Sequence, residues 1–442
     1  MSYNLKTPED VLRAIKDDDI QMIELRFTDL PGLWQHFSVP ANTFDLENFA
    51  RGIGFEESSI RESPETQGNN MLAIPDPTSA FLDPFAKIPT LVLICNVFDP
   101  LTGRNSTRDP RHIAQKAEIY LQTTQIGDAA NFGLKLEHFV FSGKGDDQST
   151  NQQIDTAEAT RSVARRVGQG HVRRPKGDHF PVPPTGRLQD IQTQVVTILE
   201  KIGIKVGAHC HELATGSLGK IDLGFATLTR AADNVMVYKY VVKNVARRHG
   251  ITATFLPNPL FGYNGSGVHV HQSIWQGERP LFASDGYAGS SALMRHYLAG
   301  LLEHAPVVRA ICAQEVNTSR RPITGSESSI KLGHAKRDSP AGPRVTMYSR
   351  DPKAKRVEFR FTDRSWNPYL AFAAMLMAGI DGFHNRLYSS PPGEPIEKLY
   401  DLPPQELAAP SSLNESLNAL EISFLLQGDV FTRDVIETHL SE

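Results

Sequence analysis

The chain has 442 residues, of which 40% are hydrophobic and 22% are charged. This composition excludes an intrinsically disordered chain, because it supplies enough apolar surface for a large core. The 46 basic and 50 acidic side chains give a formal net charge of −4, which excludes a general nucleic-acid-binding surface. No apolar run reaches the roughly 18 residues that cross a bilayer, and the first residues lack the pattern of a secretion signal.

The cysteine content indicates the redox environment. Cys95, Cys210 and Cys312 are too few and too widely spaced for a disulfide framework or a thiolate zinc site. We therefore expect a reducing, cytoplasmic location, with no nucleic-acid or membrane partner. At about 100–200 residues per domain, the length allows two or three domains.

The first hundred residues predict a small strand-rich unit that begins with one helix. Pro8 opens this helix, and strands are predicted over 22–27 and 91–98. The segment 47–83 is rich in Gly, Ser, Pro and Glu, so we expect a loop there. Pro110 is placed to begin a new helix after a short loop, which marks a boundary.

The rest of the chain alternates helices and strands. Helical spacing of apolar residues predicts helices over 188–202, 231–248 and 367–386. Strands are predicted over 132–141, 204–210, 267–274 and 356–361. This order favours an α+β arrangement, a sheet with helices packed on one side. The polar segment 143–178 is interpreted as a long functional loop.

Four predicted strands place polar groups on one face, because alternate side chains of a strand point the same way. The shared faces are Lys135 with Glu137, Cys210 with Glu212, His269 with His271 and Ser273, and Glu358 with Arg360. One such strand would be interpreted as an exposed sheet face. Four together indicate a polar cavity, because converging carboxylates and histidines suit a divalent cation or a charged substrate.

Common phosphate and nucleophile motifs are not matched. Residues 216–220 (GSLGK) resemble part of a phosphate-binding loop, but the spacing is wrong and Ile221 stands where a hydroxyl residue is needed. Residues 262–267 (GYNGSG) are not a dinucleotide fingerprint. Cys210 lies between His209 and His211, yet neighbouring strand residues point to opposite faces, so we interpret it as a buried thiol.

Several longer segments, spread over nearly the whole chain, resemble type I glutamine synthetases. They are RFTDLPG at 26–32, GFEESSI at 54–60, FPVPP at 180–184, HELATG at 211–216, NGSGVHVH at 264–271, KAKRVEFR at 353–360 and NPYLAF at 367–372. The resemblance implies a ligase of nitrogen metabolism that makes glutamine from glutamate, ATP and ammonia through a γ-glutamyl phosphate, with two divalent cations.

The resemblance also implies an architecture. We expect an N-terminal β-grasp-like domain over residues 1–105, followed by a catalytic domain over residues 106–442 with a curved antiparallel sheet backed by helices. It implies a homo-oligomer, a hexameric ring or a dodecamer of two rings, with active sites between subunits. The chain ends at Glu442, where family members usually continue into a helical arm, so we expect a single ring or a weaker double ring.

Site residues follow from matching positions. The resemblance assigns substrate binding to Asn264, Gly265, His269, Arg321 and Arg360, and places His179 in the amine pocket. It assigns proton transfer to Glu327 and Glu56, and makes Arg321 and Arg360 the catalytic arginines. The matching nucleotide positions are His271, Ser273, Arg344 and Lys355. The matching metal ligands are Glu137 and Glu212 at the first site, Glu358 at the second, and His269, which also contacts the substrate.

Two lysines depart from this pattern. Lys220 stands at a Glu position of the first metal site, and Lys135 at a Glu position of the second. An ammonium about 4 Å from a divalent ion is repelled by roughly one to several kcal/mol. Either the two ammonium groups pair with Glu137, Glu212 and Glu358 and replace the metals, or both lysines extend into solvent and metal binds weakly. Both readings stay open.

Further departures fall at the nucleotide and amine positions. Gly207 replaces a Glu of the nucleotide site, and Ser339 replaces an Arg that neutralises the transferred phosphate. We therefore expect the use of magnesium or manganese with ATP to be weakened or absent. Asp178 and His179 change the ammonium pocket, and Glu56 replaces an Asp there. Tyr400 matches a tyrosine that is adenylylated in some relatives, and we interpret it as an ordinary loop residue.

Three functions remain open. The first is an enzyme that handles a γ-glutamyl group and an amine other than ammonia, with ordinary metal–ATP glutamine synthesis impaired. The second is a catalytically dead pseudoenzyme that senses glutamate or acts as a scaffold. The third is an ATP-dependent γ-glutamyl-amide ligase with a rewired metal site.

Overall fold

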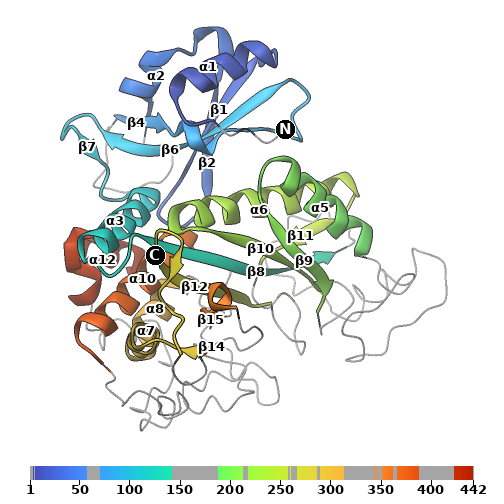
Figure 1. The fold of residues 1–442 in the computed structure, drawn as a ribbon. Coiled ribbons are helices and arrows are strands. Elements are labelled where there is room, and N and C mark those ends of the chain that lie inside the picture. The colour runs from blue at the N-terminus through green and yellow to red at the C-terminus, as the bar shows by residue number, and fades with distance from the viewer. Residues whose placement is uncertain are drawn as a thin grey trace, which may run out of the picture.

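The fold was analysed in a computed structural model. It describes residues 3, 5–56, 70–141, 188–212, 218–256, 259, 266–285, 289–312, 344–345, 351–361, 366–387 and 423–441. Two sheets with helices packed against them make up the described part, which confirms the predicted α+β class (Figure 1). None of the described helices is long and apolar enough to span a bilayer.

The N-terminal sheet has the strand order β2-β1-β6-β4-β3, with β5 and β7 paired to β6. Its strands are β1 Met22–Thr28, β2 Trp34–Pro40, β3 Ile53–Glu56, β4 Asn70–Pro75, β5 Phe81–Leu82, β6 Thr90–Asp99 and β7 Arg104–Asn105. Strands β1 and β6 are parallel, and the other pairs are antiparallel. The accompanying helices are α1 Pro8–Asp17, α2 Leu46–Arg51 and the 3-10 turns η1 Ala41–Thr43 and η3 Pro77–Ser79.

Helix α1 begins where the sequence predicts. The Thr7 side chain accepts a hydrogen bond from the Asp10 amide, and the Asp10 carboxylate accepts one from the Thr7 amide. Pro8 lacks an amide hydrogen and is suited to the first helical position.

The predicted loop over 47–83 is wrong for its described residues, which include most of α2, β3, β4, η3 and β5. Asp45 caps α2 through the amides of Glu47 and Asn48. On β4, Met71 and Ala73 alternate with less buried residues and pack into the core. Short strands with polar ends have a loop-like composition, and their pairing with distant β6 stabilises them.

The second sheet is antiparallel, with the order β14-β15-β12-β8-β10-β9, and β11 and β13 pair with β8 and β12. Its strands are β8 Ala129–Phe141, β9 Val206–His211, β10 Leu218–Thr227, β11 Thr252–Thr254, β12 Val268–Gln276, β13 Arg279–Pro280, β14 Arg344–Val345 and β15 Val357–Phe361. The four predicted strands of this region are confirmed within a few residues. Strand β10 is not predicted, because Gly219 and Gly224 weaken its strand pattern.

The helices of this part are α3 Pro110–Thr123, α5 Gln189–Lys201, α6 Leu228–Arg248, α7 Ala292–Glu303, α8 Ala305–Cys312, α10 Pro368–His384 and α12 Arg433–Ser441, with the 3-10 helices η5 Pro352–Ala354 and η7 Ser423–Asp429. The three predicted helices are therefore confirmed as α5, α6 and α10, and the predicted start at Pro110 is confirmed. Helices α5 and α6 lie on one side of β8, β9 and β10 (Figure 1).

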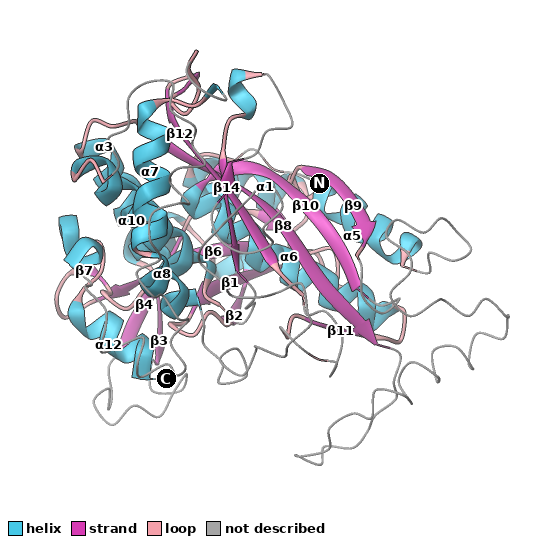
Figure 2. Ribbon diagram, turned by 90° about the horizontal axis from the view of Figure 1, so that it is seen from below, coloured by secondary structure: helices cyan, strands magenta, loops and turns pink. Residues whose placement is uncertain are grey.

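One face of this sheet packs against the helices. Leu134 and Leu136 on β8 lie opposite Leu223 and Ile221 on β10, and all four are buried in the main core. Fully burying a side chain of this size contributes about 1.5–3 kcal/mol. The view from below shows the other face of β8, β9 and β10 (Figure 2).

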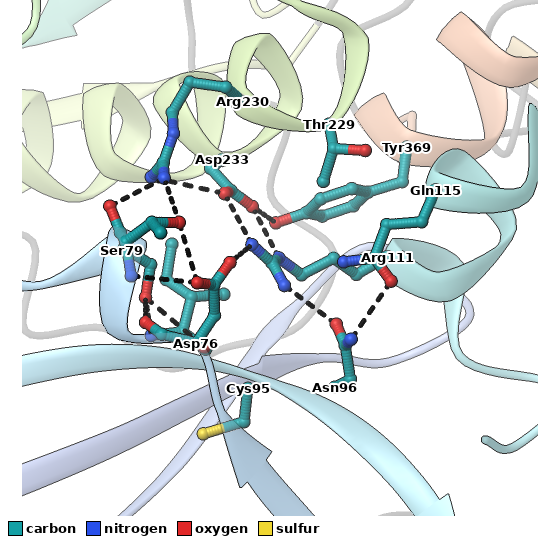
Figure 3. A network of polar contacts seen from close by, with 12 residues as sticks. Asp76, Ser79, Cys95, Asn96, Arg111, Gln115, Thr229, Arg230, Asp233 and Tyr369 are labelled. Atoms are coloured by element: carbon teal, nitrogen blue, oxygen red, sulfur yellow. Dashed lines mark hydrogen bonds and ion pairs between the residues drawn. The ribbon is translucent and has the colours of Figure 1, made fainter. Parts of the chain in front are cut away.

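A buried polar network joins the two sheets (Figure 3). Arg111 on α3 binds Asp233 on α6 and Asp76 beside the N-terminal sheet. Tyr369 on α10 donates its hydroxyl to Asp233, and Arg111 also donates to Asn96 on β6. Burial opposes the charge of Arg111, but its partners, Asp233 foremost and then Asp76 and Tyr369, together outweigh burial and hold the pKa of Arg111 well above its ordinary value.

Candidate active site

Strand register gathers the predicted polar residues on the face opposite the helices. Directly paired residues of antiparallel strands have side chains on the same side. Across the sheet, Arg360 pairs with His269, His269 with Lys135, and Lys135 with Asp222. Alongside, Lys220 pairs with Glu137, and His271 with Glu358. We call this set, together with the adjoining Glu212 and Arg356, the polar face. The register confirms that these side chains share one face, as predicted.

Glu358 anchors one end of the polar face. Its carboxylate is only 1% exposed and accepts a hydrogen bond from Arg360 Nε at 2.7 Å. His269 Nδ1 lies 3.1 Å from the same oxygen. A guanidinium held through Nε keeps donors on its two terminal nitrogens, which suits binding of a substrate carboxylate.

Lys220 is engaged at the other end of the polar face. Its ammonium donates a hydrogen bond to the Glu212 carboxylate, and both side chains are 15% exposed. Burial disfavours the ammonium, but Glu212, with smaller contributions from Cys210 and Glu137, outweighs burial, so the pKa of Lys220 is raised. Glu137, on the strand next to Lys220, accepts the Gly267 amide at 2.6 Å. Lys220 therefore pairs with a carboxylate, as the first of the two alternatives expects.

Lys135 has a different partner from the three carboxylates considered in the sequence. Its Nζ lies 3.6 Å from Asp222 Oδ2, and the two side chains are 29% and 27% exposed. Asp222 was missed because β10 was not predicted. If β10 had been predicted, alternation would have placed Asp222 on the polar face, because Asp222 lies two residues after Lys220 on the same strand.

The described nucleotide-position residues also lie along this sheet. His271 is buried, and its Nδ1 accepts a hydrogen bond from Arg356 Nε at 3.3 Å. Burial, with Arg356 nearby, lowers the pKa of His271 to about 3, so the ring is neutral at pH 7. Ser273 accepts the Trp275 indole N–H at 2.9 Å.

Two further nucleotide positions lie near the edge of the sheet. Lys355 is buried and follows η5, and its Nζ lies 3.2 Å from the point where a Cβ on Gly289 would stand. Arg344 begins β14, and its backbone pairs with Glu358.

Other sequence-predicted positions are placed elsewhere or not described. Glu56 ends β3 and so belongs to the N-terminal sheet. Gly207 lies at a register shift of β9, where an added Cβ would contact the Asp222 side chain at 3.8 Å. The positions outside the described residues are Asp178, His179, Asn264, Gly265, Arg321, Glu327, Ser339, Tyr400 and the predicted loop 143–178.

Cys210 lies on the polar face opposite Lys220. It is half-buried, so the expectation of a buried thiol holds only in part. Burial raises the pKa of Cys210. Because the thiolate is the nucleophilic form, this shift is unfavourable for a nucleophile at neutral pH.

Three carboxylates of the polar face already have hydrogen-bond partners within the chain. Glu212 is engaged by an ammonium, Glu137 by a backbone amide, and Glu358 by a guanidinium. Within the described ranges, no three or more His, Cys, Asp or Glu side chains are placed to hold a metal ion. A divalent cation needs several oxygen ligands and is repelled by an ammonium beside them.

The chain is thus an α+β protein with two sheets, one of which carries a charged face. Comparisons with known proteins identify its family. The glutamine synthetase β-grasp domain model matches residues 19–100, and the glutamine synthetase catalytic domain model matches residues 107–441. The chain is 46% identical to a glutamine synthetase of Frankia alni, covering 98% of this chain and 94% of the relative. It is 42% identical to one of Nostoc sp., with the same coverage.

Solved structures with a similar fold include members of the same family. A cryoEM structure of Plasmodium falciparum glutamine synthetase superposes with a TM-score of 0.84 at 21% identity, covering 100% of this chain and 95% of that chain. The structure "Apo GmaS without ligand" gives a TM-score of 0.73 at 25% identity, covering 97% and 91%. The chain belongs to the glutamine synthetase family. This family normally uses magnesium or manganese ions with ATP.

Proposed function

We propose that this protein joins the γ-carboxyl group of a glutamyl substrate to an amine other than ammonia, and that ordinary metal–ATP glutamine synthesis is impaired. The observation that carries the proposal is the contact between Glu358 and Arg360, at 2.7 Å. The buried carboxylate fixes the direction of the guanidinium, and a guanidinium binds a carboxylate in a planar, two-point geometry.

The proposal of an amine other than ammonia is supported by residues that differ from the family pattern at the amine pocket. Asp178, His179 and Glu57, which stands where the family has a Gly, make the amine pocket of the resemblance more polar and different in shape. Such a pocket suits a small basic or polar amine. The family fold also occurs in a structure named GmaS, so it is not confined to proteins named glutamine synthetase.

The proposed site is completed by residues beyond the polar face. Asn264, Gly265 and Arg321 would bind the glutamyl substrate, and Glu327 would take a proton from the attacking amine. Glu56 would assist from the N-terminal domain, with the domain boundary near residue 105.

Because Glu56 lies on a different sheet from the polar face, we propose that one subunit supplies it to its neighbour in a cytoplasmic hexameric ring or dodecamer. Native mass spectrometry measures this assembly. A monomer at micromolar concentration would contradict it.

Binding and turnover test the function separately. Calorimetry should show glutamate binding that Arg360→Lys weakens at least about tenfold, because the two-point geometry is lost. Arg279→Lys, on exposed β13, is the matched control and should leave binding unchanged. No glutamate binding up to its solubility limit would overturn the proposal.

The turnover assay follows γ-glutamyl amides by mass spectrometry. Glutamate with ATP, or glutamine without ATP, is supplied with ammonium and with a panel of small amines. We expect an amine to give more product than ammonium gives. Faster reaction with ammonium would identify an ordinary glutamine synthetase. Glutamate binding with no product from any amine would identify the pseudoenzyme.

A further inference from the structure

The formal charges of the polar face cancel among its own side chains. Its described cations are Lys135, Lys220, Arg356 and Arg360, and its described anions are Glu137, Glu212, Asp222 and Glu358. His269 and His271 are counted as neutral in this formal sum. Carboxylates that converge on a partly buried face need compensating positive charge. Here the chain itself supplies that charge.

We propose that Lys220 is a built-in cation, whose ammonium occupies the place that Glu137 and Glu212 would otherwise offer to a divalent metal ion. Three observations carry this. Lys220 pairs in register with Glu137, its ammonium hydrogen-bonds to Glu212, and both members of the ion pair are largely shielded from solvent. A metal ion entering here would have to break the ion pair and then lie beside a displaced ammonium.

The two neighbours of Lys220 on the sheet limit where its side chain can go. Strand β10 lies between β8 and β9, so the lysine is flanked by Glu137 on one side and Cys210 on the other. The Gln192 amide on α5 donates to the Cys210 carbonyl at 2.9 Å and so links β9 to the helix layer. The position of Lys220 is thus determined by strands with neighbours on both sides, which favours a fixed charge over a mobile surface lysine.

The same geometry predicts what a charge reversal does. Lys220→Glu would remove the ammonium and place a third carboxylate between Glu137 and Glu212. Three converging carboxylates are a favourable oxygen-ligand set for a hard divalent cation. The exchange should therefore create a divalent-cation site between Glu137 and Glu212.

This inference concerns the site of the proposed function, but its readout is cation binding, so either proposal can fail alone. The experiment is a manganese titration followed by electron paramagnetic resonance, on the full-length protein without nucleotide. The proteins are wild type, Lys220→Glu and Lys201→Glu. Lys201 ends α5 in an exposed position away from the polar face, so it controls for net charge.

We expect Lys220→Glu to bind one additional manganese ion per chain at least about tenfold more tightly than wild type, and Lys201→Glu to match wild type. Equal binding by wild type and Lys220→Glu, whether tight or absent, would overturn the proposal. If Lys220→Glu does not fold, Lys220→Gln removes the repelling charge and keeps a polar side chain, and should bind manganese more tightly than wild type. Failure of Lys220→Gln to do so would likewise overturn it.

Discussion

Arg111 and Asp233 form a two-point ion pair, with Nε–Oδ1 and Nη2–Oδ2 distances of 3.0 Å each. Their side chains are 3% and 1% exposed. The same guanidinium reaches Asp76 at 2.6 Å, beside the N-terminal sheet (Figure 3). The pair therefore connects α3 and α6 and couples the two sheets.

Replacing Arg111 should lower the free energy of unfolding. Arg111→Met would leave the buried Asp233 with only the more distant Arg230, 3.6 Å away, as a charge partner. Removing one member of a buried ion pair typically costs about 3–5 kcal/mol of unfolding free energy. Urea denaturation measures the loss. Arg51→Met removes an exposed pair with Glu47 on α2 and should cost less than about 1 kcal/mol. Similar small losses for both variants would contradict the role of the Arg111 network.

Asp109 should make stability depend on pH in an unusual direction. Burial raises its pKa to about 6, against the Val97 amide and the charge of Arg111. The folded protein therefore holds this proton at a pH where the unfolded chain, with a pKa near 3.8, has lost it. The stability that the protonated group contributes is present below pH 3.8 and is lost as pH rises through about 6.

Unfolding free energies at several pH values test this. Between pH 7 and 5, wild type should gain stability relative to Asp109→Asn. The full effect of a shift of this size is about 3 kcal/mol. Asp99→Asn is a control of opposite sign, because the Leu101 amide lowers the pKa of Asp99. Parallel pH profiles for wild type and Asp109→Asn would show that Asp109 does not titrate in this range.

Helices α7 and α10 approach each other through glycines. A Cβ on Gly382 would lie 2.3 Å from the His296 carbonyl oxygen and 2.6 Å from Gly300 Cα. Gly382→Ala should force the helices apart and destabilise the fold by about 1–3 kcal/mol. Gly54→Ala on β3 meets nothing within 4 Å and should not destabilise. Thermal unfolding compares them, and an unchanged midpoint for Gly382→Ala would contradict the close packing.

Replacing Lys135 as well as Lys220 should create a second manganese site. Lys135 lies opposite His269 on β12 and contacts Asp222 on β10. Lys135→Glu combined with Lys220→Glu adds a carboxylate beside His269 and should raise manganese stoichiometry to two ions per chain. Equilibrium dialysis with metal analysis counts the ions. A stoichiometry that stays at one would show that Lys135 does not replace a cation.

Local sequence rules predicted the parts of the fold that local chemistry controls. Helix α10 begins at the Asn367–Pro368 pair because the Asn side chain caps the Tyr369 amide and Pro suits the first turn. Strands β8, β12 and β15 were found from apolar runs, and alternation placed Glu137, His269 and Glu358 on one face. The resemblance pointed to Lys135 and Lys220 as departures before any geometry was known.

Pairing across the sheet could not be predicted in the same way. Within 47–83, strand β4 is stabilised by its pairing with β6. Strand β10 is stabilised by its pairing with β8 and β9. Both depend on residues far away in the chain, whose positions no local pattern contains.

The sequence by itself determined which charged groups this protein carries and that alternate strand residues face one way. Only the tertiary structure decided that Lys220 pairs with Glu212 and Lys135 with Asp222. The physical reason is that an ion pair forms between groups a few ångströms apart. Strand order and register, which come from the packing of the whole chain, decide which groups come that close.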